Sequence, residues 1–384
     1  MKKIAVLGST GSIGSQTLDV IRKNPDKFEV VAIVANNSYE KFYEEIMEFQ
    51  PKYAVIASEE AYKRLKGENL GKTKLLTGSE SIINISSLQE IEIVVTAMVG
   101  FSGLLPTVEA IKAKKTIALA NKETLVVAGE LIMNLAERYN APILPVDSEH
   151  SAFFQCLNGE DKKSVEKLLL TASGGPFRGK KANELKNVSI KDVLSHPTWN
   201  MGAKITVDSA TLVNKGFEAI EAKWLYDINY DQIEVVVHPE SVIHSMVEFK
   251  DGTVIAELGQ PDMRLPIQYA LSYPNRIKSD FPRLDFFKLH SLTFEKPDTE
   301  TFKGLPLAIK AGKTGGSAPC IFNAANEVAV DAFLKNQIPF TKIYEIIEST
   351  LESIPPTFNI SLETLIETDK EARDFAKEKV AQHG

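Results

Sequence analysis

The sequence predicts an α/β protein in three parts: an N-terminal Rossmann-like parallel sheet, an α/β middle domain with a flexible flap, and a C-terminal α-helical domain. From residue 3 to 146, short apolar runs alternate with amphipathic stretches, which is the pattern of βαβ units. After residue 147 this rhythm changes, and a long polar segment separates the next two apolar runs. From about residue 301 the apolar residues recur at helical spacing.

The first part contains apolar runs of strand length with amphipathic stretches between them. Strands are expected at Ile4–Leu7, Val30–Val34, Ala54–Ile56, Ile93–Thr96, Thr116–Leu119 and Ile143–Val146. Helices are expected at Gly14–Arg22, Tyr39–Phe49, Leu104–Ala113 and Thr124–Tyr139. Because strands alternate with helices, we expect a parallel sheet with helices on both faces, in a domain of residues 1–146.

The rest of the chain divides where its composition changes. In residues 147–273, strands are expected at Lys167–Thr171, Glu234–Val237 and Val254–Glu257. The polar segment 174–202 is predicted to be a structureless loop, and loops of that length often form lids; the flap is expected at about 192–202. Residues 274–300 are predicted to be a linker, and residues 301–384 a helical domain with helices at Ala318–Lys335, Phe340–Leu351 and Ser361–Gln382.

The composition argues against several classes of protein. A net charge of −7 over 384 residues disfavours nucleic acid or an anionic membrane as the main partner, although a local cationic pocket remains compatible with it. No run of about eighteen apolar residues is present, so no membrane span is expected. Cys156 and Cys320 fit no metal-ligand or redox spacing and suit a reducing compartment, so a cytoplasmic location is expected.

A glycine turn follows the first strand. Gly8, Gly11 and Gly14 have the spacing G-x-x-G-x-x-G and lead directly into the first expected helix. Small residues there let the backbone approach a pyrophosphate, and the helix N-terminus presents N–H groups to it. A purely structural tight turn is the alternative, but the position at the start of a βαβ series favours dinucleotide binding.

The end of the second strand bears on which dinucleotide binds. An NAD-binding domain places Asp or Glu there to hold the ribose 2′-hydroxyl. This chain has Val34-Ala35-Asn36-Asn37-Ser38, without a carboxylate. Its absence permits a 2′-phosphate, to which Asn37 and Ser38 can donate hydrogen bonds. NADPH is therefore favoured, although no Arg or Lys stands in this segment.

Two carboxylates follow the last strand of the first part. In an extended segment Asp147 and Glu149 point the same way and can converge on one cation at the sheet edge where α/β active sites lie. Oxygen ligands without cysteine favour Mg²⁺ or Mn²⁺ over zinc. Taken alone, such a pair is common and is better explained by a solvated loop or a helix cap.

A third carboxylate stands in the segment 207–218. Glu218 follows Asn214 by four residues, hence on the same face of a helix, and Lys215 supplies a point charge for a phosphate. Ser209 and Asn214 supply further donors. The alternative is a helix start capped by Asp208 or Ser209, and both interpretations can hold together because a helix N-terminus itself binds anions.

Taken together, the motifs resemble those of the 1-deoxy-D-xylulose 5-phosphate reductoisomerase family, in order and over nearly the whole chain. The motifs are Gly8–Gly14, Asn121-Lys122-Glu123, Asp147-Ser148-Glu149-His150, Ala172–Phe177, His196–Gly202, Asn214–Glu218, His238–Ser245, Ala318-Pro319-Cys320 and Asn323–Glu327. The resemblance implies NADPH-dependent conversion of 1-deoxy-D-xylulose 5-phosphate, a phosphorylated ketose, to 2-C-methyl-D-erythritol 4-phosphate in non-mevalonate isoprenoid biosynthesis. It implies a metal-assisted retro-aldol and aldol rearrangement followed by hydride transfer.

The resemblance also assigns roles to residues. The metal ligands would be Asp147, Glu149 and Glu218, the same residues that ligand chemistry selects. The substrate would be held by Lys122, Ser148, Glu149, Ser173, His196, Trp199, Ser209, Asn214, Lys215 and Glu218, and the catalytic groups would be Lys122, Glu149 and Glu218. The cofactor would be held by Thr10, Gly11, Ser12, Ile13, Asn37, Asn121, Glu123 and Gly202.

Three further expectations follow. Trp199 is expected to close over the substrate as part of the flap, the alternative being a partly buried anchor. His150, His238 and His244 are interpreted as structural histidines. The resemblance implies a homodimer with the middle-domain strands as its interface. The competing classes are a plain dehydrogenase, which in the semialdehyde case needs an activated cysteine, and a non-catalytic nucleotide-binding protein.

Overall fold

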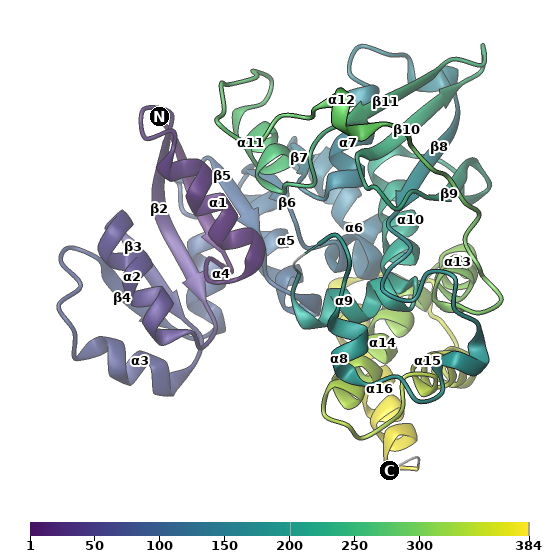
Figure 1. Cartoon of the computed structure of the whole chain (residues 1–384). Helices are drawn as coiled ribbons and strands as arrows, with labels where there is room; N and C mark the ends of the chain where they lie inside the picture. The colour runs from purple at the N-terminus through teal and green to yellow at the C-terminus, as the bar shows by residue number, and fades with distance from the viewer. Residues whose placement is uncertain (200, 383–384) are drawn as a thin grey trace. The chain divides into compact units, whose positions relative to one another are not determined.

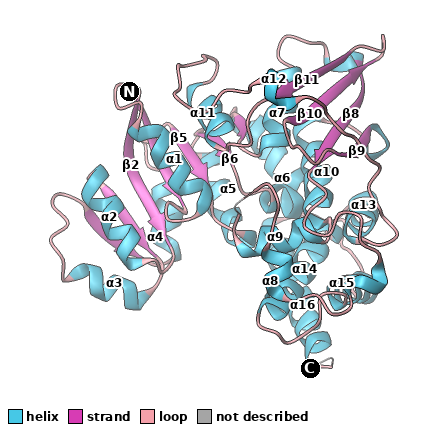
Figure 2. Ribbon diagram, in the orientation of Figure 1, coloured by secondary structure: helices cyan, strands magenta, loops and turns pink. Residues whose placement is uncertain are grey.

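The chain folds into two compact units, each made of separated segments. The computed structural model describes residues 1–199 and 201–382. Unit 1 comprises residues 1–124, 132–151 and 262–281, and unit 2 comprises residues 125–131, 152–261 and 282–384. Figure 1 traces the order of the elements along the chain, and Figure 2 shows where helices and strands lie within each unit. The domain boundaries expected from the sequence stay a prediction, because a division into compact units does not show which residues form a functional domain.

Unit 1 contains a parallel sheet of seven strands in the order β4-β3-β2-β1-β5-β6-β7. Their bounds are β1 Lys2–Leu7, β2 Phe28–Ala35, β3 Tyr53–Ile56, β4 Lys74–Thr77, β5 Ile93–Thr96, β6 Thr116–Leu119 and β7 Ile143–Pro145. The strand order reverses on either side of β1, whose residues 4–7 are fully buried. In open α/β sheets ligands bind at the carboxyl ends of strands beside such a reversal. The predicted Rossmann-like fold is confirmed.

Helices cover this sheet. They are α1 Ser12–Arg22, α2 Tyr39–Phe49, α3 Glu59–Lys66, α4 Ser79–Ser86, α5 Leu104–Lys112 after the 3₁₀ turn η1 Gly100–Gly103, α6 Glu123–Tyr139 and, from much later in the chain, α11 Arg264–Ser272. Helix α11 joins unit 1 by packing on α1, where Arg264 Nη1 lies 3.0 Å from Asp19 Oδ2. The sequence did not predict α3, α4 or β4. For β4 the reason is that none of its residues is fully buried, so no long apolar run marks the strand.

Unit 2 contains a smaller mixed sheet in the order β11-β10-β8-β9. The strands are β8 Val165–Ala172, β9 Ile233–Val237, β10 Ile243–Phe249 and β11 Val254–Leu258. Strand β10 runs antiparallel to both of its neighbours, whereas β8 and β9 are parallel. Buried Leu168 and Val247 of this sheet belong to one apolar cluster with Phe153 of helix α7 Ser148–Cys156 and Ala219 of helix α10 Val213–Tyr226. The sheet thus supports α7 and α10.

The rest of unit 2 is mainly helical, as predicted for the C-terminal part. Its helices are α8 Ile190–Leu194, α9 Ala203–Ala210, α12 Phe286–Leu289, α13 Gly304–Thr314, α14 Ala318–Leu334, α15 Lys342–Ser353 and α16 Leu362–Ala381, with 3₁₀ turns η2 Lys162–Ser164, η3 Ala182–Leu185 and η4 Tyr230–Gln232. Phe217 of α10 meets Phe322 of α14 edge-to-face at 5.5 Å between ring centroids. Helices α13 and α14 therefore pack against α10, the helix that carries Glu218.

Two local predictions were wrong. Asp147 and Glu149 do not lie in an extended segment, because β7 ends at Pro145 and α7 begins at Ser148, with the Asp147 carbonyl accepting the Ser151 N–H at 2.8 Å. The segment 174–202 is not structureless, since it contains η3 and α8. Among the described residues, no helix combines the length and apolar composition needed to cross a bilayer.

Candidate active site

The glycine turn is closed so tightly that side chains are excluded at two of its positions. Gly8 has φ +90°, and a Cβ there would lie 2.5 Å from the Ala97 carbonyl oxygen. A Cβ on Gly14 would overlap the Gly8 carbonyl oxygen. Gly11 occupies the N-cap of α1, and this residue has no side chain that could cap the first amides of that helix. These amides are consequently available to an anion.

Helix α2 supports the turn from one side. Ser9 Oγ donates to Glu45 Oε2 at 2.6 Å, and Lys41 Nζ donates to the Thr10 carbonyl at 2.8 Å and to Ser15 Oγ at 2.5 Å. Burial raises the pKa of Glu45, against the hydrogen bond from Ser9 and the charge of Lys41. Both side chains were missed by sequence reasoning, although their i, i+4 spacing on α2 places them on one face.

The predicted residues after β6 differ in what they contact. The buried Asn121 side-chain amide donates to the Met98 and Gly100 carbonyls and accepts from the Thr124 N–H at 2.8 Å, so it ties the loop after β5 to the start of α6. Lys122, 7% exposed, forms an ion pair with Asp147. Glu123 is also buried, as the first residue of α6.

Three carboxylates converge although Asp147 and Glu149 do not lie in the predicted extended segment. Asp147, Glu149 and Glu218 each offer an oxygen within 4.8 Å of the other two. Local packing explains this, because Phe153 on α7 contacts Tyr226 on α10 edge-to-face at 5.7 Å, and the same two helices carry Glu149 and Glu218. Three carboxylates without a sulfur ligand suit a hard divalent cation such as Mg²⁺ or Mn²⁺.

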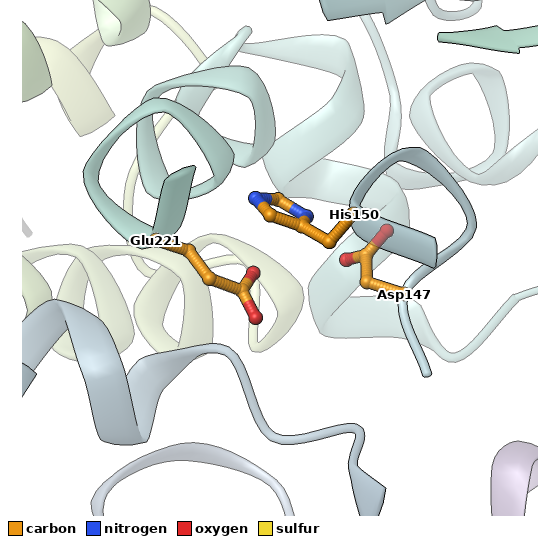
Figure 3. Close-up of side chains that lie close together, drawn as sticks. All are labelled: Asp147, His150 and Glu221. Atoms are coloured by element: carbon orange, nitrogen blue, oxygen red, sulfur yellow. The ribbon is translucent and has the colours of Figure 1, made fainter. Parts of the chain in front are cut away.

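A second group of ligand-type side chains shares Asp147. It adds His150 and Glu221, both buried, with ligand atoms that also lie within 4.8 Å of one another. Figure 3 shows the His150 ring and the Glu221 carboxylate directed toward the same space as Asp147. Sequence reasoning assigned Glu221 no role, and the interpretation of His150 as a structural histidine stays a prediction.

Glu218 also belongs to a polar group on α10. Its Oε2 accepts from Lys215 Nζ at 2.5 Å and its Oε1 from Asn214 Nδ2 at 2.5 Å. Lys215 and Glu218 are 7% and 1% exposed, so this ion pair is screened little by water. One turn of helix thus connects the predicted phosphate-binding residues to the predicted metal ligand.

The predicted phosphate-binding residues gather within unit 2. Ser173 Oγ lies 3.0 Å from His196 Nε2, and a Cβ on Gly175 would lie 2.9 Å from the Ser209 carbonyl oxygen, which brings this loop against α9. Burial and then the charge of Lys215 lower the pKa of His196. These side chains carry an imidazole, two hydroxyls and an ammonium, which are groups that suit an anion.

The predicted flap is held by the same histidine. The backbone N–H groups of Thr198 and Trp199 donate to His196 Nδ1 at 3.2 and 3.0 Å, so the neutral ring carries its proton on Nε2 and donates to Ser173. Trp199 is half-buried, and Gly202 is exposed at the N-cap of α9. Residue 200 of the predicted flap lies outside the described residues.

Ser148 and two histidines complete the predicted set. Ser148 Oγ donates to Glu149 Oε2 at 2.5 Å. His238 Nε2 accepts the N–H groups of Val242 and Ile243, both at 3.2 Å, which confirms a structural histidine. His244 Nδ1 lies 2.7 Å from Glu257 Oε2, which also ties it into the fold.

Neither cysteine is an activated nucleophile. Burial raises the pKa of Cys156 to about 12, and burial also raises that of Cys320. Both are free and buried thiols. A thiol protonated at neutral pH is a poor nucleophile, so a semialdehyde dehydrogenase chemistry is not supported.

Three protein-family models match the chain. The model described as 1-deoxy-D-xylulose 5-phosphate reductoisomerase matches residues 4–129. That of the 1-deoxy-D-xylulose 5-phosphate reductoisomerase C-terminal domain matches residues 143–226. That of the DXP reductoisomerase C-terminal domain matches residues 258–375.

Known proteins are similar over nearly the whole length. The 1-deoxy-D-xylulose 5-phosphate reductoisomerase of Clostridium botulinum (strain Loch Maree / Type A3) is 55% identical over 382 residues, 99% of both chains. That of Bacteroides thetaiotaomicron is 55% identical over 381 residues, 99% of this chain and 97% of that protein.

Solved structures show the same fold. The Zymomonas mobilis enzyme in complex with NADPH superposes with a TM-score of 0.92 at 41% identity and 99% coverage of both chains. A DOX-P reductoisomerase in complex with NADPH, fosmidomycin and magnesium superposes with a TM-score of 0.93 at 40% identity, covering 99% of this chain and 98% of that one.

Proposed function

The chain belongs to the 1-deoxy-D-xylulose 5-phosphate reductoisomerase family, and from this premise we propose how its residues carry out the reaction. It is an NADP-dependent oxidoreductase that converts 1-deoxy-D-xylulose 5-phosphate to 2-C-methyl-D-erythritol 4-phosphate, with NADPH and a divalent cation as cofactors. The conversion moves a carbon branch within the substrate and then reduces a carbonyl group. The proposal concerns which residues hold each end of the substrate and each cofactor.

The observation that carries the proposal is the pairing of Lys215 with Glu218 on α10. An ammonium suited to a phosphate lies one turn before a carboxylate suited to a metal, and both are buried. A ketose phosphate has an anionic end and an oxygen-rich end only a few bonds apart. We propose that α10 binds both ends and so fixes the register of the substrate.

The phosphate end is assigned to Ser173, His196, Ser209, Asn214 and Lys215. The Nε2–H of neutral His196 and the two serine hydroxyls donate hydrogen bonds, and Lys215 supplies the charge. When phosphate binds, the Lys215 ammonium exchanges part of its contact with Glu218 for a contact with the phosphate. Glu218 then has more of its charge available for the cation.

The reacting end is assigned to Lys122, Ser148 and Glu149, beside the metal ligands Asp147, Glu149 and Glu218. When bound, the divalent cation supplies Lewis acidity toward the substrate oxygens, and NADPH supplies the hydride. We propose that Glu149 accepts the proton of the substrate hydroxyl as a retro-aldol step breaks the carbon–carbon bond. Lys122 stabilises the negative charge that develops on oxygen, and aldol addition then forms the branched aldehyde that is reduced.

The cofactor is assigned to two groups of residues. Its pyrophosphate lies on Thr10, Gly11, Ser12 and Ile13, because the first amides of α1 have no side-chain cap. Asn37 contributes at the adenosine ribose. Asn121, Glu123 and Gly202 are assigned to the nicotinamide end. For Asn121 the role is mainly to shape the loop, since its side-chain amide already binds backbone groups.

The flap is proposed to close through Trp199. Its backbone is tied to His196, which is also a proposed phosphate ligand, so phosphate binding and flap position are linked through one ring. Closure over the substrate would exclude water and keep both fragments of the broken sugar in place.

Three further proposals concern the oligomeric state, the choice of metal ion and the cellular location of the enzyme. A homodimer is proposed through the middle-domain strands, where β11 is an edge strand with a half-exposed Val254. Mn²⁺ is proposed to replace Mg²⁺, because both prefer oxygen ligands. A cytoplasmic location is proposed because the buried cysteines are unpaired thiols.

The function is tested by following NADPH oxidation in the presence and absence of each component. Oxidation is expected only when 1-deoxy-D-xylulose 5-phosphate and Mg²⁺ or Mn²⁺ are present together. Oxidation that persists after chelation of the metal would contradict the metal assignment. Product formation without NADPH consumption would contradict the assignment of the reduction step.

A further inference from the structure

The segment after β2 lacks a positive charge of its own. Residues 34–39 contain neither Lys nor Arg, yet NADPH differs from NADH by a 2′-phosphate that sits at this strand end in Rossmann domains. Hydrogen bonds from Asn37 and Ser38 leave the charge of that phosphate uncompensated. A cation from another part of unit 1 is therefore needed for strong selection of NADPH.

Two basic side chains reach this region in unit 1. Arg64 on α3 lies with its guanidinium carbon 3.9 Å from the centroid of the Tyr39 ring, and it pairs with Glu40 at 3.0 Å. Lys41 on α2 instead contacts two neutral oxygens, the Thr10 carbonyl and Ser15 Oγ. The guanidinium of Arg64 is thus paired with an acid, whereas the hydrogen bonds of Lys41 go to neutral oxygens. The charge of Lys41 also acts on Glu45, but burial raises the pKa of that acid and Ser9 is its hydrogen-bond donor.

Lys41 also connects the two cofactor-binding segments. Its helix begins at Tyr39, three residues after the segment 36–38 begins at the end of β2, and its ammonium reaches the glycine turn at the end of β1. The adenosine ribose of a bound dinucleotide lies between these two segments. An ammonium has three N–H donors. Within the described residues the two contacts above use two of them, which leaves one for a phosphate oxygen.

We propose that Lys41 binds the 2′-phosphate of NADPH and sets the preference for NADPH over NADH. The inference rests on the proposed function, since it concerns the cofactor of the same site. Lys41 would then compensate the charge of the 2′-phosphate in place of a basic residue in the segment after β2. Glu45, one turn further along α2, has a separate role, because it binds Ser9 and supports the turn for either cofactor.

The test compares the affinities of the full-length chain for NADPH and NADH, measured by nicotinamide fluorescence without substrate or metal. Lys41→Met keeps the length of the side chain and removes the charge. It is expected to raise the Kd for NADPH about ten- to a hundredfold, the loss of one charge-assisted contact, and to leave the Kd for NADH within about twofold. Lys41→Arg should retain most of the preference. Lys63→Met, which removes an exposed lysine of α3, should change neither Kd.

Two nucleotide fragments isolate the 2′-phosphate. Adenosine 2′,5′-bisphosphate should compete with NADPH more strongly than AMP in the unaltered chain, and this advantage should disappear in Lys41→Met. Equal weakening of NADPH and NADH would show that Lys41 only supports the turn, and would overturn the inference. So would an unchanged Kd for NADPH, or loss of the preference in Arg64→Met instead.

A separate turnover experiment tests the proposed function independently of the role of Lys41. If the chain binds NADPH through Lys41 but does not consume it with 1-deoxy-D-xylulose 5-phosphate and Mg²⁺, the substrate assignment is wrong and the role of Lys41 stands. If turnover is normal and Lys41→Met shows no selective loss, only the role of Lys41 is wrong.

Discussion

Glu218 and Glu221 form a matched pair of acids on α10, three residues apart and each 1% exposed. Each belongs to one of the two groups of ligand-type side chains around Asp147, the first with Glu149 and the second with His150. Removing one carboxylate at a time decides which group holds the divalent cation. We predict that Glu218→Gln weakens metal binding and that Glu221→Gln leaves it nearly unchanged.

The contacts of Glu218 set the expected magnitude. Glutamine preserves the shape and one acceptor oxygen for Asn214, but it removes the charge and presents an N–H₂ group toward the Lys215 ammonium. One charge-assisted contact is worth about 1.5–3 kcal/mol, so the Kd for Mn²⁺ should rise about ten- to a hundredfold. For Glu221→Gln we expect a change of about threefold or less.

The measurement is a titration of the metal-free enzyme with Mn²⁺, followed by the electron paramagnetic resonance of the free ion. Circular dichroism and the Kd for NADPH check that each variant is folded. Turnover at saturating Mg²⁺ should be lost in Glu218→Gln, because the removed charge also orients the reacting end. If Glu221→Gln raised the Kd for Mn²⁺ as much as Glu218→Gln, the reasoning would be refuted and the group with His150 would be the site.

Three further outcomes are expected. The pKa of His196 is lowered from its usual 6.5, so the stability contributed by its neutral form is complete above pH 6.5 and is lost as the pH falls through the lower pKa of the folded state. Trp199 fluorescence and the free energy of unfolding from denaturant titrations should change in that pH window. If neither changed, the burial of His196 described above would be contradicted. Gly14→Ala should abolish NADPH binding, because its Cβ overlaps the Gly8 carbonyl, while Gly67→Ala, with its nearest neighbour at 3.5 Å, should bind normally in the same assay. Chelation should stop turnover reversibly without changing the Kd for NADPH, and a parallel loss of NADPH binding would indicate a structural metal.

The sequence predicted those strands in which consecutive residues are all buried. Residues 4–7 and 93–95 are continuous apolar runs because parallel strands are covered on both faces, so their pattern can be recognised without any knowledge of the fold. Strand β4, by contrast, has no buried residue and strand β10 mixes buried and accessible residues, and neither strand was predicted. Burial in these strands depends on which neighbours cover them, and that information is not local.

The metal ligands were predicted from their chemistry, but for a partly wrong geometric reason. Asp147 and Glu149 carry the oxygens that a hard cation prefers, and this holds in any backbone conformation. The structure replaces the expected extended segment with the start of α7, and it is the contact of Phe153 with α10 that brings Glu218 near. Residue types therefore indicated the ligands, and helix packing determined how they converge.

What the sequence determined by itself is the Rossmann-like sheet, the glycine turn and the residue types of a metal and phosphate site, because each of these depends on a short segment or on composition. Only the tertiary structure brought Lys41 to the glycine turn, placed Lys122 against Asp147, and presented His150 and Glu221 as a second ligand group. These contacts join residues that are tens of positions apart in the chain. Charges interact strongly when they lie close together in a low-dielectric environment, and the fold alone decides which of them meet there.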